Sequence, residues 1–191
     1  MLETAEDLQA ILAQSPLLEP VLAAWDRLAL PDVWLAAGAV AQTVWNHGFG
    51  FSPTHGINDI DIVYFDADDL SEAAEADHAQ RIRSLFSALG TWIDVKNEAR
   101  VHLWYEEKFG APIRPYRSVA DAITTFPTTA TAIGVRPEAG GLALEAPFGL
   151  TDLAALTVRA NKVQITRDIY EAKIDRWQRL WPGLRIIDWE D

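Results

Sequence analysis

The stretch INDIDIVYFD, residues 57–66, constrains the fold more than any other part of the chain. Its alternation predicts a β-strand in which Asp59 and Asp61 share one face and the isoleucines share the other. Aspartate is depleted in strands, and a buried carboxylate without a partner is unfavourable. We therefore expect the two acids at the exposed end of a buried strand.

Two carboxylates this close repel each other unless a positive charge lies between them. Magnesium is the expected cation, because it takes carboxylate oxygens and keeps open positions for substrate phosphates. The alternative is that Asp59 only caps the turn after Gly56. Because a D-x-D pattern is a weak signal by itself, the choice depends on other features of the sequence.

Two such features favour a site for phosphate and metal. A short apolar strand over 33–36 is followed by a turn at Gly38 and a helix, and the N–H groups that open such a helix point at an anion. Asp94 is a lone acid in another short strand, TWIDVKN. A third carboxylate on a neighbouring strand would complete a cage for two cations about 3.5–4 Å apart.

The remaining segments predict strands interspersed with helices, which indicates an α/β or α+β fold. Two short N-terminal helices are broken at Ser15-Pro16, and Thr4 and Asp7 have the spacing of a capping box. Residues 91–105 alternate like one bent strand or a strand pair joined near Asn97. A hairpin is expected around the Pro-Glu-Ala-Gly-Gly turn, and the chain beyond residue 150 reads as mostly helical.

Charge is distributed unevenly along the chain. The net charge is −12, and the first 80 residues hold 14 of the 28 acidic side chains but one basic residue, Arg27. The charge therefore argues against a polynucleotide partner. The absence of cysteine, of a signal-peptide pattern and of a long apolar run leads us to expect a cytoplasmic protein without a membrane partner.

The order strand, glycine turn, helix, loop and D-x-D strand with a later third acid resembles the DNA polymerase β-like nucleotidyltransferase superfamily. Within it, the chain resembles a bacterial family of nucleotidyltransferase-like proteins of unknown function over about residues 30–187. The segments that carry this resemblance are WLAAGAVAQTVWN, INDIDIVYFD, VKNEARVHLWYEEKFG, FPTTATAIGVR and DIYEAKIDRWQRLWP.

The resemblance implies a mixed β-sheet flanked by helices and one nucleotidyltransferase-like domain over residues 1–191. Its parts would be N-terminal helices in 1–30, a catalytic α/β core in 31–150 and a C-terminal helical segment in 151–191. It implies transfer of a nucleotidyl group from a nucleoside triphosphate, with ATP favoured, to a hydroxyl acceptor. A small-molecule acceptor is expected rather than a protein, and pyrophosphate would be released.

The same resemblance assigns two magnesium ions to Asp59, Asp61 and Asp94, which are also the expected catalytic residues. The expected nucleotide-binding residues are Gly38, Ala39, Asn58 and Lys96. The superfamily generally has Gly-Ser or Gly-Gly at the turn, whereas this chain has Gly38-Ala39. Ala39 keeps the backbone N–H but lacks a hydroxyl that could bind phosphate. Arg100 and His102 would share the face of Asp94 if that strand is unbroken.

Two other functions remain open at the sequence level. The chain can be a catalytically inactive nucleotide-binding or regulatory module of the same fold. It can also be a protein-modifying, antitoxin-like nucleotidyltransferase whose acceptor is a side chain of another protein.

Overall fold

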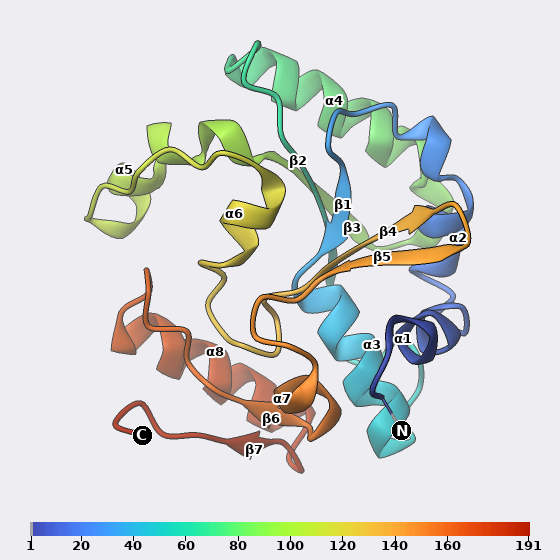
Figure 1. Ribbon diagram of the computed structural model, residues 1–191, viewed down its shortest axis with the longest axis vertical. Helices are drawn as coiled ribbons and strands as arrows, with labels where there is room; N and C mark the ends of the chain where they lie inside the picture. Colours follow the sequence, from blue (N-terminus) through green and yellow to red (C-terminus); the bar gives the residue numbers. More distant parts are fainter. Residues whose placement is uncertain (1) are drawn as a thin grey trace.

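The centre of the molecule is a five-stranded mixed sheet, seen in a computed structural model that describes residues 2–191 (Figure 1). The strand order is β3-β2-β1-β4-β5. β2 and β3 are parallel, and the other neighbouring strands are antiparallel. The predicted mixed sheet flanked by helices is therefore confirmed. The strands are β1 (Trp34–Ala36), β2 (Asp59–Tyr64), β3 (Trp92–Asn97), β4 (Gly134–Glu138) and β5 (Gly141–Glu145).

Helices cover the face of the sheet on which β2 presents its isoleucines. Ile60 and Ile62 are fully buried there, in a core that they share with apolar side chains of the N-terminal and central helices. α1 begins with the predicted capping box, in which Thr4 Oγ1 accepts a hydrogen bond from the Asp7 N–H at 3.1 Å. These elements are α1 (Ala5–Leu12), α2 (Glu19–Ala23), the 3-10 helix η1 (Trp25–Arg27), α3 (Gly38–Phe49), α4 (Glu72–Leu85) and η2 (Ser87–Leu89).

The opposite face of the sheet carries the acids of β2 and is only partly covered. α6 (Val119–Ile123) packs on Val63 and Trp34 in a smaller apolar cluster. Figure 1 shows α5 (Tyr105–Phe109), α6 and α8 (Arg167–Leu180) on one side of the sheet. The acid face is thus bordered by segments that come from the second half of the chain.

The segment after β3 differs from its predicted strand. Residues Glu98–Leu103 form a 3-10 helix, η3, because the side chain of Asn97 caps it: Asn97 Oδ1 accepts a hydrogen bond from the Ala99 N–H at 3.1 Å. The chain therefore leaves the sheet after Asn97. The expectation that Arg100 and His102 continue the face of Asp94 is wrong, since it required an unbroken strand.

The C-terminal segment is less helical than expected, because it also holds a small two-stranded parallel sheet. Its elements are α7 (Thr151–Ala154), β6 (Thr157–Val158), α8 and β7 (Arg185–Ile186). No helix within residues 2–191 is long and apolar enough to cross a membrane.

Tryptophans join α8 to α3. Trp45 makes edge contacts with Trp177 and Trp181, with ring centroids 5.2 and 5.3 Å apart. The indole N–H of Trp181 donates to Asn46 Oδ1 at 2.7 Å. Gly56, with φ +68°, lies under the same ring, where a Cβ would meet it at 2.5 Å. These contacts hold the C-terminal helix at one position relative to the sheet.

A buried ion pair fixes the turn from β3 into η3. Glu75 Oε1 accepts from Arg100 Nη1 at 2.7 Å, and Glu75 Oε2 accepts from the Asn97 N–H at 2.7 Å. Both side chains are about one-tenth exposed. Because a pair like this is already desolvated, removing one partner leaves an uncompensated charge in the interior.

Arg100→Ala is therefore expected to lower the free energy of unfolding by about 3–5 kcal/mol. Arg167→Ala is the matched control, since Arg167 is half exposed and its ion pairs with Glu171 and Glu190 lie at the surface. The loss for this variant is expected to be below about 1 kcal/mol. Urea unfolding of both variants provides the comparison. Equal losses for the two would contradict the role given to the buried pair.

Candidate active site

The carboxylates of β2 and β3 meet because the two strands are parallel and paired in register. Asp61 lies opposite Asp94, and Asp59 lies opposite Trp92. All three acids are partly exposed, in contrast to the buried residues that alternate with them. The structure therefore brings Asp59, Asp61 and Asp94 to one face of the sheet, where the sequence predicted them.

The surroundings of Asp61 disfavour its charged form. Burial raises the pKa of Asp61 to about 7, and the negative charges of Asp59 and Asp94 act in the same direction. Lys173 and a backbone hydrogen bond from Gly38 lower the pKa, but by less. A cation bound here would relieve this repulsion, because an opposite charge nearby favours the ionised carboxylate.

Asp94 has cationic neighbours of its own. Lys96 Nζ lies 3.4 Å from Asp94 Oδ1, and Arg83 Nη2 lies 3.9 Å from the same oxygen. The Arg83 guanidinium stacks on the Trp92 ring at 3.9 Å. Lys96, predicted to share a face with Asp94, is thus adjacent to it in the free protein.

The predicted phosphate turn lies beside the acid pair. Ala36, the last residue of β1, pairs with Asp61, and α3 begins two residues later at Gly38. Ala37 adopts φ 57° and ψ −129°, a conformation that is unfavourable for a residue with a Cβ, and its N–H donates to Ile133 O at 2.9 Å. Strain of about 1–3 kcal/mol in such turns is characteristic of functional sites.

The other predicted nucleotide-binding residues lie at the edges of this region. Ala39 is buried in the first turn of α3. Asn58 is exposed one residue before β2, and its carbonyl accepts a hydrogen bond from Thr91 Oγ1 at 3.1 Å. Its side chain is exposed to solvent.

Sequence reasoning missed Lys173 on α8. Burial lowers the pKa of Lys173, as does Arg176, whereas Asp61 and Asp59 raise it. A signal was present in the sequence, because Lys173 falls on the same helical stripe as Ile169 and the buried Trp177. A lysine on the helix face that points into the protein indicates that an acidic group lies opposite it.

Glu98 was also missed. Burial raises the pKa of Glu98 to about 8, and the charges of Asp61 and Glu75 act in the same direction. Glu98 follows Lys96 by two residues, at the start of η3, and is 6% exposed. The two-residue spacing from Asp94 and Lys96 includes Glu98, but the predicted strand gave weight to Arg100 and His102 instead.

The carboxylates of this face fit a magnesium ion that is bound by two side chains together with substrate phosphates. Within residues 2–191 no three His, Cys, Asp or Glu side chains stand close enough to hold one metal ion together. Asp59 and Asp61 form a two-carboxylate pair on an open face, and magnesium is commonly held by one or two carboxylates together with substrate phosphates. The oxygen-only chemistry and the excess negative charge at Asp61 agree with that mode.

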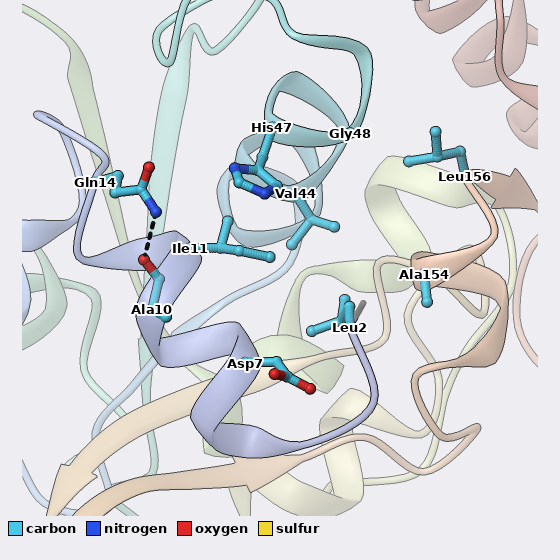
Figure 2. A pocket seen from close by; sticks show the side chains of 10 residues that line it. All are labelled: Leu2, Asp7, Ala10, Ile11, Gln14, Val44, His47, Gly48, Ala154 and Leu156. Carbon is cyan, nitrogen blue, oxygen red and sulfur yellow. Dashed lines mark hydrogen bonds between the residues drawn. The ribbon is translucent and has the colours of Figure 1, made fainter.

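Two cavities of about 430 Å³ differ in their relation to the acids. One lies among α1, α3 and α7 and is lined mainly by apolar side chains with Asp7, Gln14 and His47 (Figure 2). The other, called here the η3–α8 cavity, is lined by residues of β3, η3, α5 and α8 and of the loops beside α6 and α8, among them Lys96, Glu98 and Lys173. Lys173 connects the second cavity to the acid pair.

The raised pKa of Glu98 has a consequence for stability. The unfolded chain loses this proton near pH 4.5, whereas the folded protein keeps it to about pH 8. The contribution of Glu98 to stability therefore falls as pH rises through this window, by up to about 1.4 kcal/mol per pH unit. We expect Glu98→Gln to gain stability relative to the wild type as pH rises from 5 to 8.

Urea unfolding at several pH values measures this difference. Glu106→Gln, at an exposed position of α5, is the control and is expected to follow the wild-type pH profile. A constant difference between Glu98→Gln and the wild type across the window would contradict the account of Glu98.

Comparisons with known proteins agree with the fold of this chain. A structure solved by NMR and described as a CCA-adding enzyme head domain has 26% sequence identity and a TM-score of 0.78, covering 96% of this chain and 95% of that chain. A CCA-adding enzyme in its apo form has a similar fold, with 15% identity and a TM-score of 0.56; the match covers 97% of this chain and 43% of that one. The search of curated proteins found no match. A family model described as Nucleotidyltransferase matches residues 23–186, so the chain belongs to that nucleotidyltransferase family.

Proposed function

We propose that the protein transfers a nucleoside monophosphate from a nucleoside triphosphate to a hydroxyl acceptor, releases pyrophosphate, and depends on magnesium. The observation that carries this proposal is the register of β2 and β3, which sets Asp61 beside Asp94 at the start of α3. Family membership supports nucleotidyl transfer in general. ATP is the favoured donor, as the superfamily resemblance implies.

The roles of the residues follow from their positions. Asp59 and Asp61 would hold one magnesium ion together with substrate phosphates. Asp94 would join one acid of this pair at a second ion, so that no ion needs all three carboxylates. When bound, magnesium supplies positive charge that neutralises phosphate oxygens and lowers the pKa of an attacking hydroxyl. Gly38 and Ala39 would lie beside the triphosphate, because the beginning of a helix favours anions. The N–H of Gly38 already donates to Asp61, so this turn would also hold that acid in place.

In the reaction, the acceptor oxygen forms a bond to the α-phosphorus and the bond from that phosphorus to the leaving pyrophosphate breaks. The proton of the acceptor hydroxyl passes to a base, and Asp94 is the candidate because it flanks Asp61 on the side away from β1. Lys96 and Lys173 add positive charge next to the acids. Asn58 borders the site and would contact a phosphate.

The acceptor is the least determined part of the proposal. The net charge of −12 pointed to a small molecule and away from a polynucleotide. The NMR structure similar to this chain is described as a CCA-adding enzyme head domain. An RNA end therefore joins the small molecules as a candidate acceptor, and the exclusion of polynucleotides is not kept. An inactive module is disfavoured, because the three acids remain together on one open face.

Incubation of the protein with magnesium and α-labelled nucleoside triphosphates tests the activity. Small-molecule and RNA fractions of a cell extract would be supplied separately as acceptors. We expect label to pass to one fraction with release of pyrophosphate. Asp61→Asn is expected to lower the rate at least about 100-fold, because charge stabilisation of several kcal/mol is lost.

The fold of that variant separates a catalytic role from a structural one. Asp61→Asn removes a charge that burial and two neighbouring acids disfavour, so its unfolding temperature at pH 8 is expected to equal or exceed that of the wild type. Asp68→Asn, at an exposed position beyond β2, is the control and should keep the wild-type rate. A folded Asp61→Asn with a near-normal rate would contradict the mechanism.

A further inference from the structure

We propose that the η3–α8 cavity is the acceptor pocket and that it takes a nucleoside, with Glu98 contacting the edge of the base. The inference rests on the proposed nucleotidyl transfer and adds the chemical class of the acceptor. Three observations carry it. The cavity lies on the β3 side of the acid pair, its wall is aromatic, and the buried Glu98 is among the residues that line it.

The position of the cavity follows from the geometry of phosphoryl transfer. Attacking and leaving oxygens lie roughly in line on opposite sides of the phosphorus. The sheet order β3-β2-β1 places the start of α3, the proposed phosphate turn, on the β1 side of the acid pair. The attacking hydroxyl is then on the β3 side, where Lys96 and Glu98 lead from Asp94 into the cavity.

The wall of the cavity provides flat apolar surface next to positive charge. The rings of Tyr105 and Phe109 lie 4.5 Å apart, and Phe109 is 37% exposed. Lys108 Nζ lies 5.4 Å from the Trp104 ring and 5.3 Å from the Phe109 ring. Tyr105 itself is buried and supports the exposed ring of Phe109. An exposed aromatic ring beside a lysine is an arrangement that stacks bases and attracts phosphate in proteins that bind single-stranded nucleic acid.

Glu98 is the acidic side chain among the residues that line the cavity. The residue is 6% exposed, its side chain lines the cavity, and no side-chain hydrogen bond joins it to another of the described residues. An apolar ligand would leave that carboxyl unpaired, which is unfavourable in a water-poor site. The edge of a nucleobase offers hydrogen-bond donors and acceptors in the plane of its ring, so one ligand can satisfy both the aromatic wall and Glu98.

A volume of about 430 Å³ is within the range of small-molecule sites. It accommodates one nucleoside with its phosphate, whether this is a free mononucleotide or the last residue of an RNA chain. Both sources present the same chemistry: a base for the rings and Glu98, a ribose hydroxyl for Asp94, and a phosphate for the lysines.

Calorimetric titration of AMP, CMP, GMP and UMP, and of a short oligoribonucleotide, tests the inference. At least one of these probes is expected to bind the wild type. Phe109→Ala is expected to weaken binding of every probe about tenfold or more, because stacking does not depend on base identity. Glu98→Gln is expected to change the order of preference among the four monophosphates.

Phe148→Ala is the matched control, since Phe148 is 42% exposed and does not line the cavity. It should bind like the wild type. Binding of the oligomer only, with strong salt dependence, would identify an RNA end as the source, and equal binding of a monophosphate would identify a mononucleotide; both results support the pocket.

Titration of a nucleoside triphosphate with magnesium separates the two proposals. If the triphosphate binds the wild type but no probe does, the acceptor pocket is refuted while nucleotidyl transfer stands. Probe binding that is unchanged in both Phe109→Ala and Glu98→Gln likewise overturns the pocket. Loss of triphosphate binding itself counts against the proposed function.

Discussion

The parallel pairing of β2 with β3 is the constraint on which the rest of the site depends. It sets Asp61 opposite Asp94, and the antiparallel pairing of β1 brings the start of α3 to the same level. Because side chains alternate along a strand, a slip of one residue in β2 would turn both acids into the core and its isoleucines outward. The apolar contacts of Ile60 and Ile62 therefore fix the register that the acids need.

This arrangement concentrates negative charge on a face that the fold only partly neutralises. Burial and two neighbouring acids raise the pKa of Asp61, while Lys173 acts against them from α8. The tryptophans that join α8 to α3 hold that lysine in place. A magnesium–nucleotide complex brings both the cation that Asp59 and Asp61 need and the phosphates that the lysines and the start of α3 attract.

The sequence predicted those parts of the structure that follow from the alternation of side chains along a strand and from the residues of a turn. The two-residue period placed Asp59, Asp61 and Asp94 on strand faces, and the glycine turn marked the start of α3. The strand predicted beyond Asn97 was wrong, because the cap that Asn97 places on η3 competes with strand pairing. The helical stripe of Lys173 shows that its side chain points inward, but only the packing of α8 shows that it faces the acids. Ala37 is held in its conformation by tertiary contacts, which no local sequence pattern reveals.

Titration of ATP, CTP, GTP and UTP by calorimetry, with and without magnesium, tests the central claim most directly. The account predicts that the wild type binds at least one triphosphate in a magnesium-dependent manner and that a folded Asp59→Asn/Asp61→Asn variant does not. No binding by the folded wild type, or binding that persists in the double variant, would contradict the assignment of the two acids to metal and nucleotide.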